Sequence, residues 1–195
     1  MSTRRTTTTT PLGPLALLLG CLLASSSQAA EPTTTFTLSS PDIKAESSLT
    51  NKQVFNGFGC SGDNISPALR WHGAPKGTQS YALTVYDPDA PTGSGWWHWV
   101  VFNIPAKSNA LPGHIQGDGK GLPDGAIQSL TDFGPPGFGG ACPPVGDKPH
   151  RYQFTLHALK VPALDLPASS MPALVGFMIH ANELASTRFT AYYGR

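Results

Sequence analysis

The chain has 195 residues and a formal charge of +1 at pH 7; only 13% of its residues are charged, whereas glycine (21) and proline (19) are abundant. A near-neutral chain without a basic run argues against nucleic-acid binding. Abundant glycine and proline with little charge predict many turns and few long surface helices.

The first thirty residues have the organisation of a secretory signal peptide. Arg4 and Arg5 give a short positive start, an apolar run follows over 15–23, and small polar residues occupy 25–30. Secretory signal peptides share this order: a positively charged start, a short apolar core and small residues at the cleavage site. The apolar run is too short to cross a bilayer comfortably.

We predict cleavage between Ala29 and Ala30, which gives a signal peptide over 1–29 and one domain over 30–195. The cleaved chain keeps 166 residues, enough for a domain with a hydrophobic core, and its formal charge becomes −1 because two arginines are removed. This implies export to the periplasm or the extracellular space, with no transmembrane segment in the mature chain. A membrane anchor and a lipoprotein signal at Cys21 are the alternatives, and the apolar residues that follow Cys21 favour the ordinary signal.

Alternating polar and apolar residues, or apolar runs, predict four strands: 36–40, 80–87, 97–104 and 150–159. The second of these has the clearest pattern, with Tyr81, Leu83 and Val85 on one face. The third is apolar on both faces, which predicts an interior strand. The segments 49–70 and 118–145 are rich in turn-forming residues and predict long loops.

One segment near the end of the chain has helical periodicity. Its apolar stripe consists of Leu174, Met178, Ala181 and Ala185. Ser169 or Ser170 is the expected N-cap and Pro172 suits the first turn. His180 and Glu183 are expected on the helix surface or packed beside the stripe. Several strands with one late helix predict a mainly β fold of antiparallel sheets.

Polar residues that could form a functional site occur at the ends of three predicted strands, the first of which is 87–91. Its two prolines fix a stiff, extended exit from the strand. Asp87 and Asp89 are two residues apart in extended chain, so they are expected to face one region. A plain turn explains the same residues, since Asp and Pro are common turn formers.

The second strand end holds His98, between tryptophans, on the predicted face of Val100, Phe102 and Ile104. A histidine that leads a buried face needs a partner for each ring nitrogen. It is either part of a ligand site or a core histidine bonded to a backbone carbonyl.

The third strand end is His150-Arg151-Tyr152. The period of two puts His150 and Tyr152 on one face, where they form a donor-rich patch suited to oxyanions. Arg151 faces the other way and is expected to pair with a carboxylate or brace a loop. The segment 137–144, which precedes this strand, is rich in glycine and other small residues, so a ligand can come close to its backbone.

Two cysteines, Cys60 and Cys142, remain in the predicted mature chain. An even number of cysteines in an oxidising compartment indicates a disulfide. Two separate buried thiols are an equally good interpretation of the sequence.

Five segments carry a family resemblance together: 87–91 (Asp-Pro-Asp-Ala-Pro), 96–99 (Trp-Trp-His-Trp), 103–105 (Asn-Ile-Pro), 143–144 (Pro-Pro) and 150–152 (His-Arg-Tyr). In this order they resemble the phosphatidylethanolamine-binding protein family. Residues 60–67 and 192–195 resemble its bacterial, Raf-kinase-inhibitor-like branch. The resemblance covers about residues 36–195.

The resemblance implies antiparallel sheets in Greek-key order with peripheral helices, and a small anion-binding pocket. The implied ligand-binding residues are Asp87, His98, Cys142, Pro143, His150 and Tyr152. Asp89 and Arg151 are implied as supporting residues, and the bacterial branch implies a bridge between Cys60 and Cys142. Two positions depart from the family pattern, because Phe138 stands where a tyrosine is usual and Cys142 where a glycine is common.

We therefore expect a binding module for phosphate-bearing groups, such as a lipid head group or a phosphorylated protein, that inhibits or regulates a protein partner. We expect no enzyme activity, no cofactor and no bound metal, and a homodimer is compatible with the sequence. One alternative is a metal-dependent hydrolase that uses Asp87, Asp89, His98 and His150 as ligands. The other is an interaction module whose pocket is vestigial.

Overall fold

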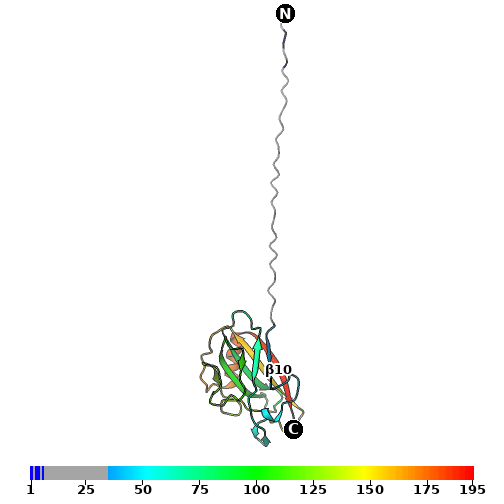
Figure 1. Ribbon diagram of the computed structural model, residues 1–195, viewed down its shortest axis with the longest axis vertical. Helices are drawn as coiled ribbons and strands as arrows, with labels where there is room; N and C mark the ends of the chain where they lie inside the picture. Colours follow the sequence, from blue (N-terminus) through cyan, green and yellow to red (C-terminus); the bar gives the residue numbers. More distant parts are fainter. Residues whose placement is uncertain (2, 5, 7–34) are drawn as a thin grey trace. The chain divides into compact units, whose positions relative to one another are not determined.

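The computed structural model describes residues 1, 3, 4, 6 and 35–195 (Figure 1). The predicted signal peptide over 1–29 and its cleavage site therefore fall largely outside the described residues, and they stay a prediction. Within the described part of the chain, no helix combines the length and the apolar character needed to cross a membrane.

A five-stranded antiparallel sheet forms the centre of the fold, with the strand order β10-β9-β5-β6-β8. Its members are β5 (Ser80–Asp87), β6 (Trp96–Pro105), β8 (Ile127–Gln128), β9 (His150–Leu159) and β10 (Glu183–Tyr193). The central strand β5 pairs with β6, which follows it closely, and with β9, which comes about seventy residues later. Three of the four predicted strands are confirmed here, and β6 is an interior strand as expected.

A smaller antiparallel sheet, ordered β1-β4-β7, contains the remaining predicted strand. Its members are β1 (Thr37–Ser39), β4 (Leu69–His72) and β7 (Ala110–Leu111). The predicted loop over 49–70 also holds the 3-10 helix η1 (Asn51–Gln53) and a short hairpin of β2 (Asn56–Gly57) and β3 (Cys60–Ser61). The loop over 118–145 is irregular apart from β8, so both loop predictions missed only short elements.

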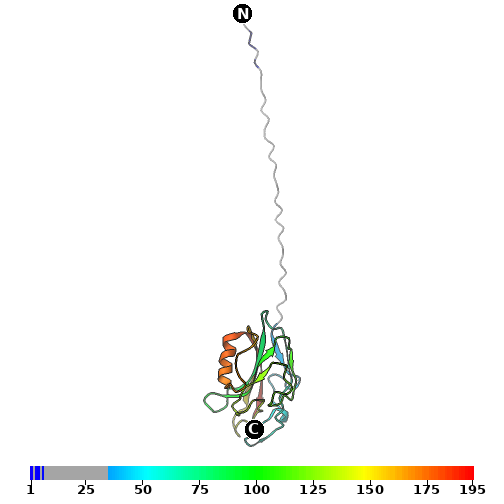
Figure 2. The same ribbon diagram turned by 90° about the vertical axis from the view of Figure 1, so that its left-hand side faces the viewer.

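Two apolar cores lie on the two faces of the large sheet. Tyr81, Leu83 and Val85 of β5 are on one face, as predicted, and contribute to a core shared with Leu38 of β1 and Trp71 of β4. The other core, on the opposite face, lies between the sheet and the helix α1 (Pro172–Asn182). Figure 2 shows α1 on one side of the sheet, with the shorter strands on the other. The fold is thus a sheet-on-sheet packing with one helix on the outer face.

The predicted orientation of α1 is wrong in its details. The residues that it buries are Pro172, Val175 and Ile179, whereas Leu174 of the predicted stripe is 47% exposed. The helix is apolar on nearly every side, so periodicity alone could not choose the buried face. Pro172 lies in the first turn as expected. The N-cap is Met171, with no side-chain cap, so the predicted caps Ser169 and Ser170 are wrong.

The strand β10 was not predicted. Ala185 and Glu183, which were assigned to the helix, belong to this strand instead. Its side chains alternate between exposed and partly buried positions at the edge of the sheet, and the alternation is weak because Ser, Thr and Ala occupy both faces.

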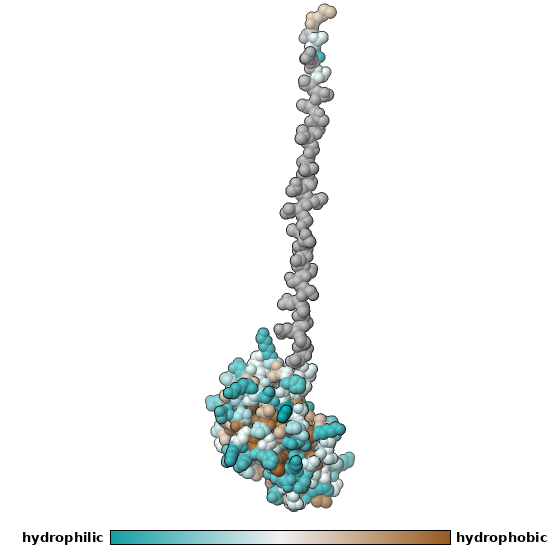
Figure 3. Space-filling model, viewed as in Figure 1, coloured by the Kyte–Doolittle hydropathy of each residue, from teal (hydrophilic) through white to brown (hydrophobic). Residues whose placement is uncertain are grey.

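On the face of the molecule shown in Figure 3, apolar residues form only small brown areas between polar side chains.

Asn103 occupies a register shift in β6. Between the pairs Tyr81–Ile104 and Leu83–Val101 the strand β6 has one residue more than β5. Asn103 has a φ of 57°, a left-handed conformation that asparagine tolerates better than most residues. Its side chain also donates to the carbonyl of Leu164 (3.2 Å) and accepts from the Leu164 N–H (2.7 Å). The segment 103–105, one of the five that carry the family resemblance, therefore has a structural role: it fixes a bulge and ties β6 to the loop after β9.

We expect Asn103→Ala to lower the free energy of unfolding by about 2–3 kcal/mol. The variant loses two hydrogen bonds of about 1 kcal/mol each and keeps a left-handed backbone that disfavours alanine by about 1 kcal/mol. Urea unfolding followed by tryptophan fluorescence is the measurement. Asn109→Ala, at an exposed position, is the matched control and should change stability by less than about 0.5 kcal/mol. Equal stability of the two variants would contradict this role.

Candidate functional site

A small cavity of about 160 Å³ lies where β5, β6 and β9 meet the loop over 142–144. All six residues that the resemblance implied as ligand-binding line it: Asp87, His98, Cys142, Pro143, His150 and Tyr152. Asp87 ends β5, His150 begins β9, and the two strands are neighbours in the sheet. Antiparallel pairing thus brings residues about sixty positions apart into one wall.

His98 reaches this cavity through a second irregularity in β6. Val85 pairs with Trp99 and Tyr86 with Trp97, so that His98 is an extra residue without a partner on β5. The bulge turns its ring toward Tyr152, with ring centroids 5.0 Å apart. The predicted face of His98 is therefore wrong, since Val100 and Phe102 pack in the opposite core. Period-two reasoning failed here because a bulge shifts the alternation by one residue.

The buried ring of His98 is anchored by one nitrogen. Nδ1 donates to the carbonyl of Gly139 at 2.7 Å, the backbone partner expected of a core histidine. This bond leaves Nε2 as the ring nitrogen without a hydrogen bond to the described residues. Burial lowers the pKa of His98, and the Gly139 carbonyl and the Asp87 carboxylate oppose this effect. The core and ligand-site interpretations of His98 are thus compatible, because each uses a different nitrogen.

Asp87 orients His150 rather than His98. The Nδ1 of His150 donates to Oδ2 of Asp87 at 2.7 Å, and both side chains are almost fully buried. On the other side, Nε2 of His150 lies 3.5 Å from Oδ2 of the half-exposed Asp147. The second oxygen of Asp87 accepts from the backbone N–H of Asp89 at 2.8 Å. The carboxylate is therefore held by protein donors and fixes the imidazole in one orientation.

Tyr152 supplies a hydroxyl that stays protonated. Burial and the nearby carboxylate of Asp87 raise the pKa of Tyr152 well above its usual range. A protonated phenol in a buried cavity is a hydrogen-bond donor over the whole physiological pH range.

Asp89 and Arg151 form a separate brace. The guanidinium donates to both carboxylate oxygens (2.6 and 2.9 Å), and the backbone N–H of Arg151 donates to Oδ2 at 2.9 Å. Arg151 holds the pKa of the Asp89 carboxyl below its usual value. Asp89 therefore does not face the cavity with Asp87, which corrects that expectation, while the predicted support by Asp89 and Arg151 fits this geometry.

The four ligands of the alternative metal site are not gathered around one point. Asp89 is engaged by Arg151, and Asp87 and His150 are bonded to each other. Among the described residues, no group of three or more His, Cys, Asp or Glu side chains is arranged to hold a metal ion.

Three aromatic rings close the cavity: Trp96, which lies beside His98 in the sequence and was expected to wall a pocket, and Phe58 and Phe133, which the sequence did not single out. Phe58, Trp96 and Phe133 line it, and the ring of Phe133 lies 5.3 Å from His98 and 5.4 Å from Trp96. Gly139 has no side chain at a point where a Cβ would overlap the ring of Phe133, so this glycine makes room for a protein ring rather than for a ligand. No periodic signal marks Phe133, because it lies in the irregular loop over 118–145.

Phe138, the expected departure at the rim, does not line this cavity. Its ring packs edge-on against the buried Trp99, with centroids 5.7 Å apart. The missing hydroxyl at position 138 therefore does not remove a donor from the residues that line the cavity.

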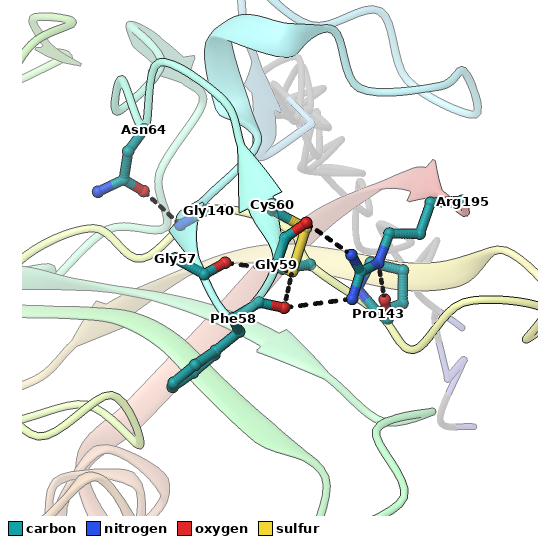
Figure 4. Close-up of a disulfide and its surroundings, with 9 residues drawn as sticks. Gly57, Phe58, Gly59, Cys60, Asn64, Gly140, Pro143 and Arg195 are labelled. Atoms are coloured by element: carbon teal, nitrogen blue, oxygen red, sulfur yellow. Dashed lines mark hydrogen bonds between the residues drawn. A yellow bond between two sulfur atoms is a disulfide. The ribbon is translucent and has the colours of Figure 1, made fainter.

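A disulfide joins Cys60 to Cys142, with the two Cα atoms 6.0 Å apart, which confirms the predicted pairing (Figure 4). The bridge fastens the hairpin that carries Phe58 to the wall that carries Cys142 and Pro143. The sulfur of Cys142 also lies 3.6 Å from the carbonyl oxygens of Gly57 and Phe58. A bonded sulfur has no proton, so these are packing contacts rather than hydrogen bonds.

Arg195 makes a second connection between the same two loops. Its guanidinium donates to the carbonyls of Pro143 (2.6 Å), Gly59 (3.0 Å) and Phe58 (3.3 Å), as Figure 4 shows. Asn64, away from Arg195 in Figure 4, accepts from the N–H of Gly140 at 2.7 Å and donates to the carbonyl of Phe138 at 3.3 Å. The wall around Cys142 is therefore held by one covalent bond and by several hydrogen bonds from residues distant in sequence.

The protein is thus an antiparallel β fold of two packed sheets, with a small cavity made by two histidines, a carboxylate and a phenol at the strand ends. Comparison with known proteins identifies the class: residues 39–194 match the family described as phosphatidylethanolamine-binding protein. The chain belongs to this family, as its sequence resemblance indicated.

Its relatives include two proteins of Escherichia coli (strain K12). YbcL is 55% identical over 159 residues, which cover 81% of this chain and 87% of YbcL. YbhB is 51% identical over 159 residues, which cover 80% of this chain and 98% of YbhB. The crystal structure of YbcL matches with a TM-score of 0.81 over 82% of this chain and 98% of that chain. LppC of Mycobacterium tuberculosis, a candidate lipoprotein, is 39% identical over 111 residues, 56% of this chain and 50% of LppC.

We expect thiol titration of the denatured, unreduced domain to find no free thiol at Cys60 or Cys142. Replacing both by serine should lower the free energy of unfolding by ~4–5 kcal/mol in the chain-entropy model, because the bridge closes a loop of 82 positions. Urea unfolding with and without dithiothreitol tests this. Reductant should destabilise the wild type only, and an equal effect on the double variant would refute the assignment.

Proposed function

We propose that the cavity at Asp87, His98, His150 and Tyr152 binds a small phosphate-bearing group. The observation that supports this proposal most is that six residues from four separate chain segments line one buried cavity of about 160 Å³. Buried polar side chains are costly to assemble unless each finds a partner, and a ligand is the partner that the free groups still need.

The free groups suit an oxyanion. Protonated Tyr152 donates through its hydroxyl, and protonated His98 donates through Nε2, because Gly139 already occupies its Nδ1. Asp87 is held by His150 and by the N–H of Asp89, so its negative charge is compensated from the protein side rather than turned toward the ligand. The arginine nearest in sequence, Arg151, is engaged by Asp89, so the site lacks a guanidinium fork and binding should be weak.

The size of the cavity limits the ligand. Its volume of about 160 Å³ is below the roughly 300–1,000 Å³ of pockets for drug-sized ligands. It accommodates inorganic phosphate, a phospholipid head group or the phosphate of a modified protein, while the rest of such a ligand stays outside. Phe58 at the rim is 68% exposed and offers an apolar surface to whatever carries the phosphate.

We infer that this cavity serves binding rather than catalysis, and that the protein acts by engaging a phosphate-bearing partner whose activity it inhibits or regulates. None of the described residues that line the cavity forms a hydroxyl–imidazole or thiol–imidazole pair suited to nucleophilic catalysis. The disulfide supports a location outside the cytoplasm, in the periplasm or the extracellular space, and the relationship to LppC keeps a lipid-anchored form open to test.

The affinity for sulfate should rise as the pH falls from 8 to 5. Burial depresses the pKa of His98 below its usual value, so the ring is neutral near pH 7, and a bound anion favours the protonated form that donates from Nε2. Sulfate keeps a fixed charge over this range, so the trend reports the protein. Isothermal calorimetry or NMR titration measures it.

The variants His98→Ala and Tyr152→Phe identify the donors. Each should lose a hydrogen bond to a charged group, ~1.5–3 kcal/mol of binding free energy, and His98→Ala should also flatten the pH dependence. The exposed His72 provides the matched control His72→Gln. Unchanged affinity in His98→Ala and Tyr152→Phe would place the ligand elsewhere.

A further inference from the structure

A second cleft, of about 230 Å³, lies on the opposite face of the large sheet, between the sheet and α1. Strand alternation separates the two sites: His150 and Tyr152 of β9 face the first cavity, whereas Gln153, Thr155 and His157 line the second cleft. The remaining residues of the cleft include an aromatic wall from β5 and β6 and an arginine from β10.

The floor of the cleft is polar, although helix and sheet enclose it. Thr84 and Thr155 are each only 6% exposed, and they are directly paired across β5 and β9. The hydroxyl of Thr84 is bonded to Nε2 of His157 at 3.2 Å. The hydroxyl of Thr155 forms no hydrogen bond with residues 35–195, and it is open to the cleft rather than sealed from solvent. A hydroxyl of this kind is available to a ligand that enters the cleft.

The carboxylate oxygens of Glu183 and the amide oxygen of Gln153 are already engaged. Oε2 of Glu183 accepts from Nδ1 of His157 at 2.5 Å, and Oε1 accepts from the hydroxyl of Ser186 at 3.2 Å. The hydrogen bond from His157 lowers the pKa of the Glu183 carboxyl, and it occupies Oε2 of this group. Oε1 of Gln153 accepts from Nη1 of Arg188 at 2.8 Å.

Several of the groups that remain free are donors. Arg188 lies opposite Thr155 in the register of β10 and β9, and it has no carboxylate within ion-pair distance in the described part of the chain. Its guanidinium has five N–H groups, of which the bond to Gln153 uses one. The amide of Gln153, oriented by that bond, has its NH₂ group left to donate, and the Thr155 hydroxyl is adjacent.

An apolar wall stands next to these donors. The rings of Tyr86 and Trp97 pack together with centroids 4.6 Å apart, and Ile179 of α1 adds an aliphatic surface. The hydroxyl of Tyr86 donates to the carbonyl of Ser94 at 2.7 Å, so this ring contributes contact area rather than a donor. Free donors beside an aromatic wall suit a ligand with an anionic acceptor at one end and an apolar body at the other.

We propose that this cleft is a second binding site, which takes a small organic carboxylate whose carboxylate is bound by Arg188, Gln153 and Thr155 and whose apolar body packs on Trp97. The cleft is larger than the first cavity, and a planar acid such as benzoate has the required shape and charge. This site is independent of the phosphate-bearing ligand proposed for the other face.

NMR titration of the full domain with benzoate tests the proposal, with benzyl alcohol as a neutral ligand of similar shape. Benzoate should shift the indole N–H signal of Trp97 and not that of Trp71, and benzyl alcohol should bind at least about tenfold more weakly. Saturating phosphate should leave the benzoate affinity unchanged, because the two sites lie on opposite faces. A benzoate effect that phosphate abolishes would assign the ligand to the first cavity and overturn the proposal.

Two variants test the residues. Arg188→Gln and Thr155→Val should each weaken benzoate binding by about tenfold or more, since each removes a donor to a charged group. Arg70→Gln makes the same charge change at an exposed position on β4 and should have no effect. Circular dichroism checks that each variant is folded; Arg188 is exposed, so its replacement should leave the fold intact. Equal benzoate affinity in Arg188→Gln and Arg70→Gln, or no shift at Trp97 in the wild type, would refute the site.

Discussion

The candidate anion site depends on one extra residue in β6. Because Val85 pairs with Trp99 and Tyr86 with Trp97, His98 is displaced from the regular ladder and turns toward Tyr152. Without this bulge the imidazole would lie with Val100 in the core under α1, on the wrong side of the sheet. Bulges commonly re-aim a single side chain near a functional site, and here the effect is to place one ring on the far wall of the cavity.

The bulge also explains which parts of the site could be predicted. The period of two placed His150 and Tyr152 together, and the same alternation placed Leu83 and Val85 in the core, because β5 and β9 are regular over most of their lengths. The side of the sheet on which His98 lies could not be predicted in this way, because no residue type in the sequence marks a bulge at that position. The family resemblance, in contrast, placed His98 among the ligand-binding residues, although periodicity assigned it to the wrong face.

The helix α1 and the edge strand β10 show the same limit of prediction from sequence periodicity. The helix α1 was located by its periodicity, but its apolar residues surround the axis, so only tertiary packing selects Val175 and Ile179 as the buried pair. The strand β10 begins directly at the end of α1 with no glycine or proline to separate them. Its mixed Ser, Thr and Ala residues fit a half-exposed edge strand, where neither burial nor exposure imposes a clear alternation.

The topology of the large sheet has a consequence for the order in which the molecule assembles. Thr84 of β5 pairs with Thr155 of β9, and β9 in turn pairs with β10 at the end of the chain. The central strand therefore lacks one of its neighbours until most of the polypeptide has left the ribosome. Non-local pairing of this kind slows folding. The bridge between Cys60 and Cys142 follows the same order, because it joins positions 82 residues apart and can form only once the second cysteine has also emerged.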